Sequence, residues 1–231
     1  EFIRRSEPEA EVYALTAPLL TKADGSKFGK SDEGNIWLDP EMTSPYQFYQ
    51  FWINTDDRDL KKYLKYFSLR PLDEIEELLD QADEDPRTVK RILAEELTDR
   101  IHTKSMRNRV EKVSEILFNP KAEESLLRDL DRDEIEMIRA EIPSFDVDRT
   151  LFEEGVDLID LMTEYTDVTG SKGEAKRAIK GKAVRVNRSK VTDLQYRLDN
   201  DDLLQSDYLL LENGKKNKFL IHCNSGGTET E

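Results

Sequence analysis

Two lysines that lie close together in a polar loop are the residues best suited to chemistry in this sequence. Lys27 and Lys30 are separated by a Phe-Gly pair, and the hydroxyl of Ser31 follows directly. The loop, residues 21–34, contains an Asp-Gly turn signal and further glycines, which permit backbone movement. Two ammonium groups on a mobile loop suit a phosphate chain whose charge shifts during a reaction. The alternative is a solvated surface loop, which these residues alone leave open.

A second candidate site is a concentration of basic residues in an otherwise acidic chain. The net charge is −15, yet the only acid within residues 171–190 is Glu174. Lysine and arginine contacts to phosphates supply most RNA affinity, so this segment predicts an RNA-binding face. The alternative is a solvated helix and hairpin. The basic residues of the segment are Lys172, Lys176, Arg177, Lys180, Lys182, Arg185, Arg188 and Lys190.

Other groups that could do chemistry favour structural roles. The aromatic run 46–52 could stack bases, but its helical spacing favours packing in a core. The acids in 55–59 are expected to cap a helix, and the acidic run 73–85 is expected to be a solvated face. His102 and Cys223 are expected to be structural. With one cysteine and two histidines, the chain cannot form a zinc site of the usual kind, and we predict no metal site.

Composition limits the class of protein. The chain has 231 residues, of which 37% are hydrophobic and 37% charged, a polar balance typical of helices with wide solvated faces. No apolar run is long enough to span a membrane. A single cysteine rules out an internal disulfide and is compatible with a reducing compartment, so we expect a cytoplasmic protein.

The elements expected to position these groups are mainly helical. A short strand over 15–21 would enter the lysine loop, and Ser44-Pro45 predicts the start of the first of several helices that continue to residue 142. Residues 143–155 are expected to be a linker. After it, a helix over 172–180, a strand over 183–187, a turn over 187–190 and a closing strand pair (208–211 and 219–221) predict a small α+β module. The tail 225–231 is expected to be disordered.

Three segments in this order, residues 19–31, 37–40 and 44–59, closely resemble the bacterial or organellar tyrosyl-tRNA synthetases, a class I aminoacyl-tRNA synthetase family. The segments 171–180 and 184–187 resemble a small RNA-binding fold named after a ribosomal small-subunit protein. Together the resemblance covers nearly the whole chain. It implies that residues 1–44 are a remnant of an α/β catalytic domain, 45–142 a helical anticodon-binding domain and 156–224 an α+β RNA-binding domain. The expected fold class is therefore mainly α with a small α+β module at the C-terminus.

The resemblance also implies roles for the loop residues. The lysine loop corresponds to the class I "KMSKS" element, in which Phe-Gly is a usual tyrosyl-type variant. Lys27 and Lys30 would then contact the ATP triphosphate, and Ser31 would help shape the loop. ATP enters as a substrate with Mg²⁺, and no tightly bound cofactor is expected. Tyrosine is first converted to tyrosyl-adenylate and then transferred to a ribose hydroxyl of tyrosine tRNA.

One feature of the family is missing from this sequence. The family carries a His-x-Gly-His element upstream of the lysine loop, whereas His102 and His222 are the only histidines here. We therefore expect a C-terminal fragment that binds tRNA and is catalytically inactive alone. The family enzymes are homodimers, but their dimer contact lies in the missing half, so the fragment is compatible with a monomer. The alternatives are a stand-alone RNA-binding protein without catalysis, or a helical adaptor, which leaves the basic segment unexplained.

Overall fold

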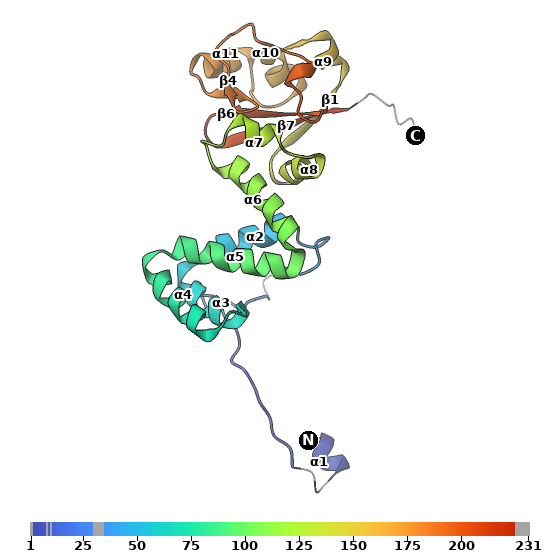
Figure 1. Ribbon diagram of the computed structural model, residues 1–231. Coiled ribbons are helices and arrows are strands. Elements are labelled where there is room, and N and C mark those ends of the chain that lie inside the picture. The colour runs from blue at the N-terminus through green and yellow to red at the C-terminus, as the bar shows by residue number, and fades with distance from the viewer. Residues whose placement is uncertain (1, 8, 10, 30–34, 225–231) are drawn as a thin grey trace. The chain divides into compact units, whose positions relative to one another are not determined.

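The computed structural model describes residues 2–7, 9, 11–29 and 35–224 and divides into two compact units (Figure 1). The first unit is Glu1–Ile101 and the second is His102–Glu231. Residues 102–142, which the resemblance places in one domain with the preceding helices, lie in the unit that contains the sheet. No described helix is both long and apolar enough to cross a membrane.

The first unit is helical. Ser44 caps its second helix by accepting from the Gln47 amide, with proline in the first turn as predicted. The next helix is capped by Asp56, so the prediction that acids of 55–59 act as caps is confirmed for this residue. The helices are α1 (Phe2–Ser6), α2 (Pro45–Ile53), α3 (Asp57–Phe67), α4 (Leu72–Glu84) and α5 (Pro86–His102).

Side chains of α2 and α3 form an aromatic core in this unit. Phe48 is 2% exposed and Trp52 4% exposed, and Tyr63 of α3 is equally buried. Burial of these large aromatic rings on one face of the short helix α2 stabilises its packing against α3. The prediction that the aromatic run packs in a core is therefore confirmed.

The strand expected over residues 15–21 does not form. Residues 11–20 have no regular structure, and Leu15 is fully exposed. A strand needs a hydrogen-bonded neighbour. Among the described residues, the one ladder contact of this segment is the isolated bridge between Thr21 and Lys27.

The second unit combines three helices with a small α+β module. Its helices are α6 (Lys104–Phe118), α7 (Glu124–Arg128), α8 (Arg132–Glu141), α9 (Thr150–Glu154), α10 (Leu158–Asp160) and α11 (Lys172–Lys180), with a π-helical turn, η1, at Leu161–Tyr165 and a 3₁₀ turn, η2, at Asn200–Asp202. Its strands are β1 (Ser144–Asp148), β2 (Val156–Asp157), β3 (Val184–Val186), β4 (Ser189–Lys190), β5 (Arg197–Leu198), β6 (Tyr208–Asn213) and β7 (Asn217–Asn224).

Five of these strands form one sheet in the order β1-β7-β6-β3-β4, and β2 pairs with β5. In Figure 1, α9, α10 and α11 lie on one side of the five-stranded sheet, and α7 and α8 lie on the other. Ile179 of α11 packs with Leu209, Leu211 and Ile221 of the sheet in one apolar core. The predicted closing strand pair is present as β6 and β7, whose connection passes through Gly214 at a φ of 83°.

The predicted linker over 143–155 is wrong. Residues 144–148 form β1, which pairs in parallel with β7, and residues 150–154 form α9. Phe145 lies opposite Ile221 in this pairing. A partner so distant in the sequence leaves no local signal, which explains why this short, charged segment resembled a connection.

Candidate functional site

The lysine loop begins as a tight hairpin in the first unit. The Lys22 amide donates to the Ser26 carbonyl at 2.8 Å, and the Phe28 amide donates to the Leu20 carbonyl at 3.0 Å. Gly25 makes the turn at a φ of 85°, a conformation that favours glycine. Lys27 lies on the second arm and is exposed. Lys30 and Ser31 lie outside the described residues.

An aromatic contact anchors the second arm of this hairpin. The Phe28 ring lies among rings of α2 and α3, with its centroid 5.3 Å from Tyr63, 5.4 Å from Phe67 and 6.3 Å from Trp52. Ring pairs at these separations contribute beyond simple burial. Phe28, the first of the two residues between the lysines, therefore fixes the loop to the helices. The Lys27 side chain faces solvent.

A cavity of about 490 Å³ opens beside the hairpin, between residues 22–24 and the helix junction of α2 and α3. Gln50, Asn54 and Arg58 contribute to its lining. Arg58 makes two bonds to the Asp56 carboxylate, at 3.0 and 2.7 Å. These hydrogen bonds, together with one from the Arg58 backbone amide, lower the pKa of Asp56 to about 2. The sequence indicated no binding residues here beyond helix caps.

The basic segment is presented by one amphipathic helix. Ser171 caps α11 by accepting from the Glu174 amide, and Gly181 ends the helix, as predicted. Ala175 and Ile179 face the core and are fully buried. The remaining surface of the helix exposes Lys176, Arg177 and Lys180, so the structure brings these three basic side chains together. Lys182 and Lys190 are exposed on the adjoining turn and strand.

Lys172 belongs to the same helix but is engaged within the unit. Its ammonium lies 2.7 Å from Asp160 and 2.6 Å from Glu164. Hydrogen bonds to these two carboxylates raise the pKa of Lys172. Its charge is therefore neutralised locally, whereas no ion pair involving Lys176, Arg177 or Lys180 is found within the described part of the chain.

Arg188 does not join the basic face. Its side chain is 3% exposed and its Nη1 lies 2.5 Å from Glu212 Oε1. Nη2 donates to the carbonyls of Ile116 and Asn119 at the end of α6. The prediction of an exposed RNA contact is wrong for Arg188, because its guanidinium is used inside the protein. Arg185 is half-buried and lies 3.8 Å from the same glutamate, so it is less available than the lysines of α11.

The turn that carries Arg188 explains this inward direction. Asn187 and Arg188 have φ values of 46° and 74° and join β3 to β4. Two consecutive positive φ values are typical of the two-residue turns that suit the twist of a hairpin. The Asn187 side chain also bonds the sheet, accepting from the Leu210 amide at 2.9 Å. The sequence gives no indication that the arginine in this turn is buried, because its partners lie far away along the chain.

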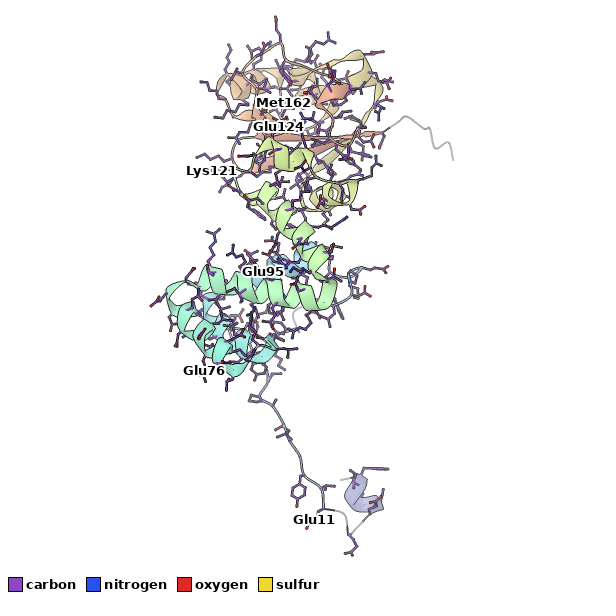
Figure 2. All side chains as sticks on the ribbon, viewed as in Figure 1. Glu11, Glu76, Glu95, Lys121, Glu124 and Met162 are labelled. Atoms are coloured by element: carbon purple, nitrogen blue, oxygen red, sulfur yellow. The ribbon has the colours of Figure 1, made fainter. Side chains whose placement is uncertain are left out.

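Cys223 is buried, His102 is half-buried and the acidic run is exposed. Cys223 is 2% exposed, and burial raises the pKa of its thiol to about 11. Burial lowers the pKa of His102. The acidic run lies on the exposed surface of α4, where Glu76 points outward in Figure 2. Within residues 2–7, 9, 11–29 and 35–224, no cluster of His, Cys, Asp or Glu has the geometry to hold a metal ion.

Two family models match this chain. The model described as "tRNA synthetases class I (W and Y)" matches residues 1–119, and the one described as "Tyrosine--tRNA ligase SYY-like C-terminal domain" matches residues 134–221. The first therefore covers the lysine hairpin and the helices of the first unit, and the second covers the whole basic segment and most of its sheet.

Curated relatives agree with these matches. The chain is 44% identical to a tyrosine–tRNA ligase of Porphyromonas gingivalis over 223 residues, which are 96% of this chain and 51% of that protein. It is 39% identical to tyrosine–tRNA ligase 1 of Bacillus subtilis over 224 residues, with the same shares covered. The chain thus spans about half the length of the curated relatives it matches.

A solved structure is also similar. The C-terminally truncated mitochondrial tyrosyl-tRNA synthetase of Coccidioides posadasii is 33% identical, with a TM-score of 0.38, over 48% of this chain and 32% of that one.

Proposed function

The chain belongs to the class I tRNA synthetases of the tyrosyl and tryptophanyl group, in the tyrosyl-tRNA synthetase family, and we propose that it is the C-terminal part of a tyrosine–tRNA ligase. The complete ligase would join tyrosine to ATP, forming tyrosyl-adenylate and pyrophosphate, and then transfer the tyrosyl group to a terminal ribose hydroxyl of the tRNA. We further propose that the complete ligase is a cytoplasmic homodimer.

The lysine hairpin is the proposed contribution of this chain to the first step. Lys27 and Lys30 would neutralise the charge that develops on the leaving pyrophosphate, and Ser31 would help to shape the loop. Magnesium enters with ATP as part of the substrate. The observation that supports this role is that the hairpin is fixed through Phe28 while the Lys27 ammonium stays exposed to a ligand.

Binding of tRNA is the proposed function of the second unit. The contacts would come chiefly from Lys176, Arg177 and Lys180, with Lys182 and Lys190 beside them. These charges stand in a chain whose net charge is −15, so nonspecific attraction of RNA by the remaining surface is disfavoured. Lys172 contributes less because two carboxylates hold its ammonium.

The experiment that tests the RNA-binding role uses this chain and tyrosine tRNA. The triple variant K176E/R177E/K180E should bind much more weakly, and its log–log salt slope should be smaller by about one for each lost phosphate contact. The matched control K176R/R177K/K180R keeps every charge and should retain the slope. Unchanged binding by the charge-reversed variant would remove α11 from the proposed interface.

The catalytic role is tested in the complete ligase. Lys27→Ala should slow tyrosine-dependent ATP–pyrophosphate exchange chiefly through kcat, because the lysine is proposed to act in the transition state. The affinity for tRNA should not change. A variant with normal exchange and weakened tRNA binding would show that the loop is an RNA contact instead. The chain alone should show no exchange activity.

A further inference from the structure

A buried carboxylate holds the first arm of the lysine hairpin. Asp59 lies in the first turn of α3 and is 3% exposed. Its Oδ2 accepts from the Ala23 amide at 2.8 Å, and its Oδ1 lies 3.2 Å from the Lys62 Nζ. A buried carboxylate is costly unless it is paired and hydrogen-bonded. Here the hairpin backbone satisfies Oδ2 and the Lys62 ammonium satisfies Oδ1.

Lys62 extends the same contact to a second point on the arm. Its Nζ donates to the Thr21 carbonyl at 2.5 Å while it pairs with Asp59. One ion pair on α3 therefore binds the backbone at residues 21 and 23. An acid whose only role was to interact with the dipole of α3 would not need to contact the hairpin, which is distant in the sequence.

The two arms of the hairpin are thus anchored by different means. Asp59 and Lys62 bind the first arm, and the Phe28 ring packs the second arm against the aromatic core. Lys27 is the residue directly before Phe28 and pairs with Thr21 across the hairpin. Its backbone position is therefore set by both anchors, although its side chain is exposed.

We propose that Asp59 and Lys62 form a clamp that positions Lys27 for the triphosphate, with Asp59 as a positioning residue. The proposal rests on the proposed role of the loop in ATP chemistry. Charge-assisted hydrogen bonds are stronger than neutral ones and hold a preferred geometry. A misplacement of a charged group by about 1 Å can reduce a rate on the order of a hundredfold.

The first test measures the hairpin directly by amide hydrogen exchange in this chain. Lys62→Met should speed exchange at the amides of Lys22 and Phe28, whose acceptors lie within the hairpin. The expected acceleration is on the order of tenfold to a hundredfold, the equivalent of losing a hydrogen bond to a charged group. Lys62→Arg keeps the cation and should preserve protection. Unchanged exchange in Lys62→Met would overturn the clamp.

The role of Asp59 is tested in the same way with a matched control. Asp59→Ala should speed exchange at Ala23 and in the rest of the hairpin. Asp73→Ala removes an exposed acid from the first turn of α4 and should leave the hairpin unchanged. If Asp59→Ala fails to fold, Lys62→Met still decides the outcome because the Lys62 side chain is 36% exposed.

The second test asks whether the clamp acts through Lys27. In the complete ligase, Lys62→Met should lower the kcat of ATP–pyrophosphate exchange about tenfold or more, with tRNA affinity unchanged. Lys62→Arg should restore most of the rate. Adding Lys62→Met to Lys27→Ala should cause no further loss, since a clamp without its lysine has nothing to position. Additive losses would mean that the clamp is merely structural.

The two tests separate failure of the clamp from failure of the proposed function. Unchanged hydrogen exchange rejects the clamp whatever the loop does. Faster hydrogen exchange with a normal pyrophosphate-exchange rate in both Lys62→Met and Lys27→Ala keeps the clamp as a structural contact and rejects both the catalytic role of the loop and the positioning role of Asp59.

Discussion

Replacing Arg188 by alanine tests the division of the basic residues into exposed and structural ones. Arg188 was predicted from the sequence to contact RNA, but its guanidinium bonds Glu212 and two carbonyls at the end of α6. The variant leaves the Glu212 side chain, which is 4% exposed, without its main partner. The expected result is a loss of stability in the second unit.

The size of the loss follows from the burial of the pair. Removing one member of a buried ion pair typically costs about 3–5 kcal/mol, because the remaining charge is left uncompensated. Arg185 lies 3.8 Å from Glu212 and keeps part of the compensation. We therefore expect a loss of about 3 kcal/mol, a large fraction of the stability of a small domain. The double variant R188A/E212A should be less destabilised than the sum of the single variants.

The assay can separate the two units because both tryptophans lie in the first. Trp37 and Trp52 report urea unfolding of the first unit by fluorescence, which should be the same in Arg188→Ala and the unchanged chain. Hydrogen exchange of the β6 and β7 amides reports the second unit and should accelerate. Normal exchange in β6 and β7, together with a loss of tRNA affinity as large as in Lys176→Ala, would refute the structural role of Arg188.

Three further predictions concern groups whose surroundings are defined by the structure. Phe28→Ala should weaken docking of the hairpin by about 2 kcal/mol and shift the fluorescence of Trp52, whose ring it contacts; an unchanged spectrum would count against the anchor. Burial raises the pKa of Cys223 from 9.0 to about 11, so between these pH values the thiol ionises more readily in the unfolded state than in the folded state. The thiol therefore contributes about 2–3 kcal/mol to the free energy of unfolding below pH 9, and this contribution is lost as the pH rises toward 11. Cys223→Ala should lack this component in denaturation measured across that range, and equal pH dependence in both proteins would contradict it. Lys172→Met should reduce the salt slope of tRNA binding less than Lys176→Met, since Lys172 is already paired; equal reductions would show that its ion pairs open on binding.

Local sequence signals predicted most helices correctly. Ser44 before proline and Ser171 before the basic helix both start helices where expected, because a capping hydroxyl satisfies amides within the same turn. The aromatic spacing of α2 likewise predicted burial, since it depends only on the helical period. These features need no information from distant parts of the chain.

Features that depend on distant partners could not be predicted in this way. β1 forms because residues 144–148 pair with β7, and nothing in that short segment indicates the partner. Arg188 is buried because Glu212 and the end of α6 surround it. In the sequence it is one basic residue among others that are exposed, and nothing nearby distinguishes it from them. Asp59 was predicted to be a helix-terminal acid, and its bond to the Ala23 amide is visible only in three dimensions.

The most direct test of the account is the amino acid dependence of ATP–pyrophosphate exchange by the proposed complete ligase. The matching class I family includes both tyrosyl and tryptophanyl enzymes, so the assay compares tyrosine with tryptophan. The account predicts exchange with tyrosine, strongly reduced by Lys27→Ala, and none with tryptophan. Exchange that depends on tryptophan, or tyrosine-dependent exchange that is indifferent to Lys27, would contradict it.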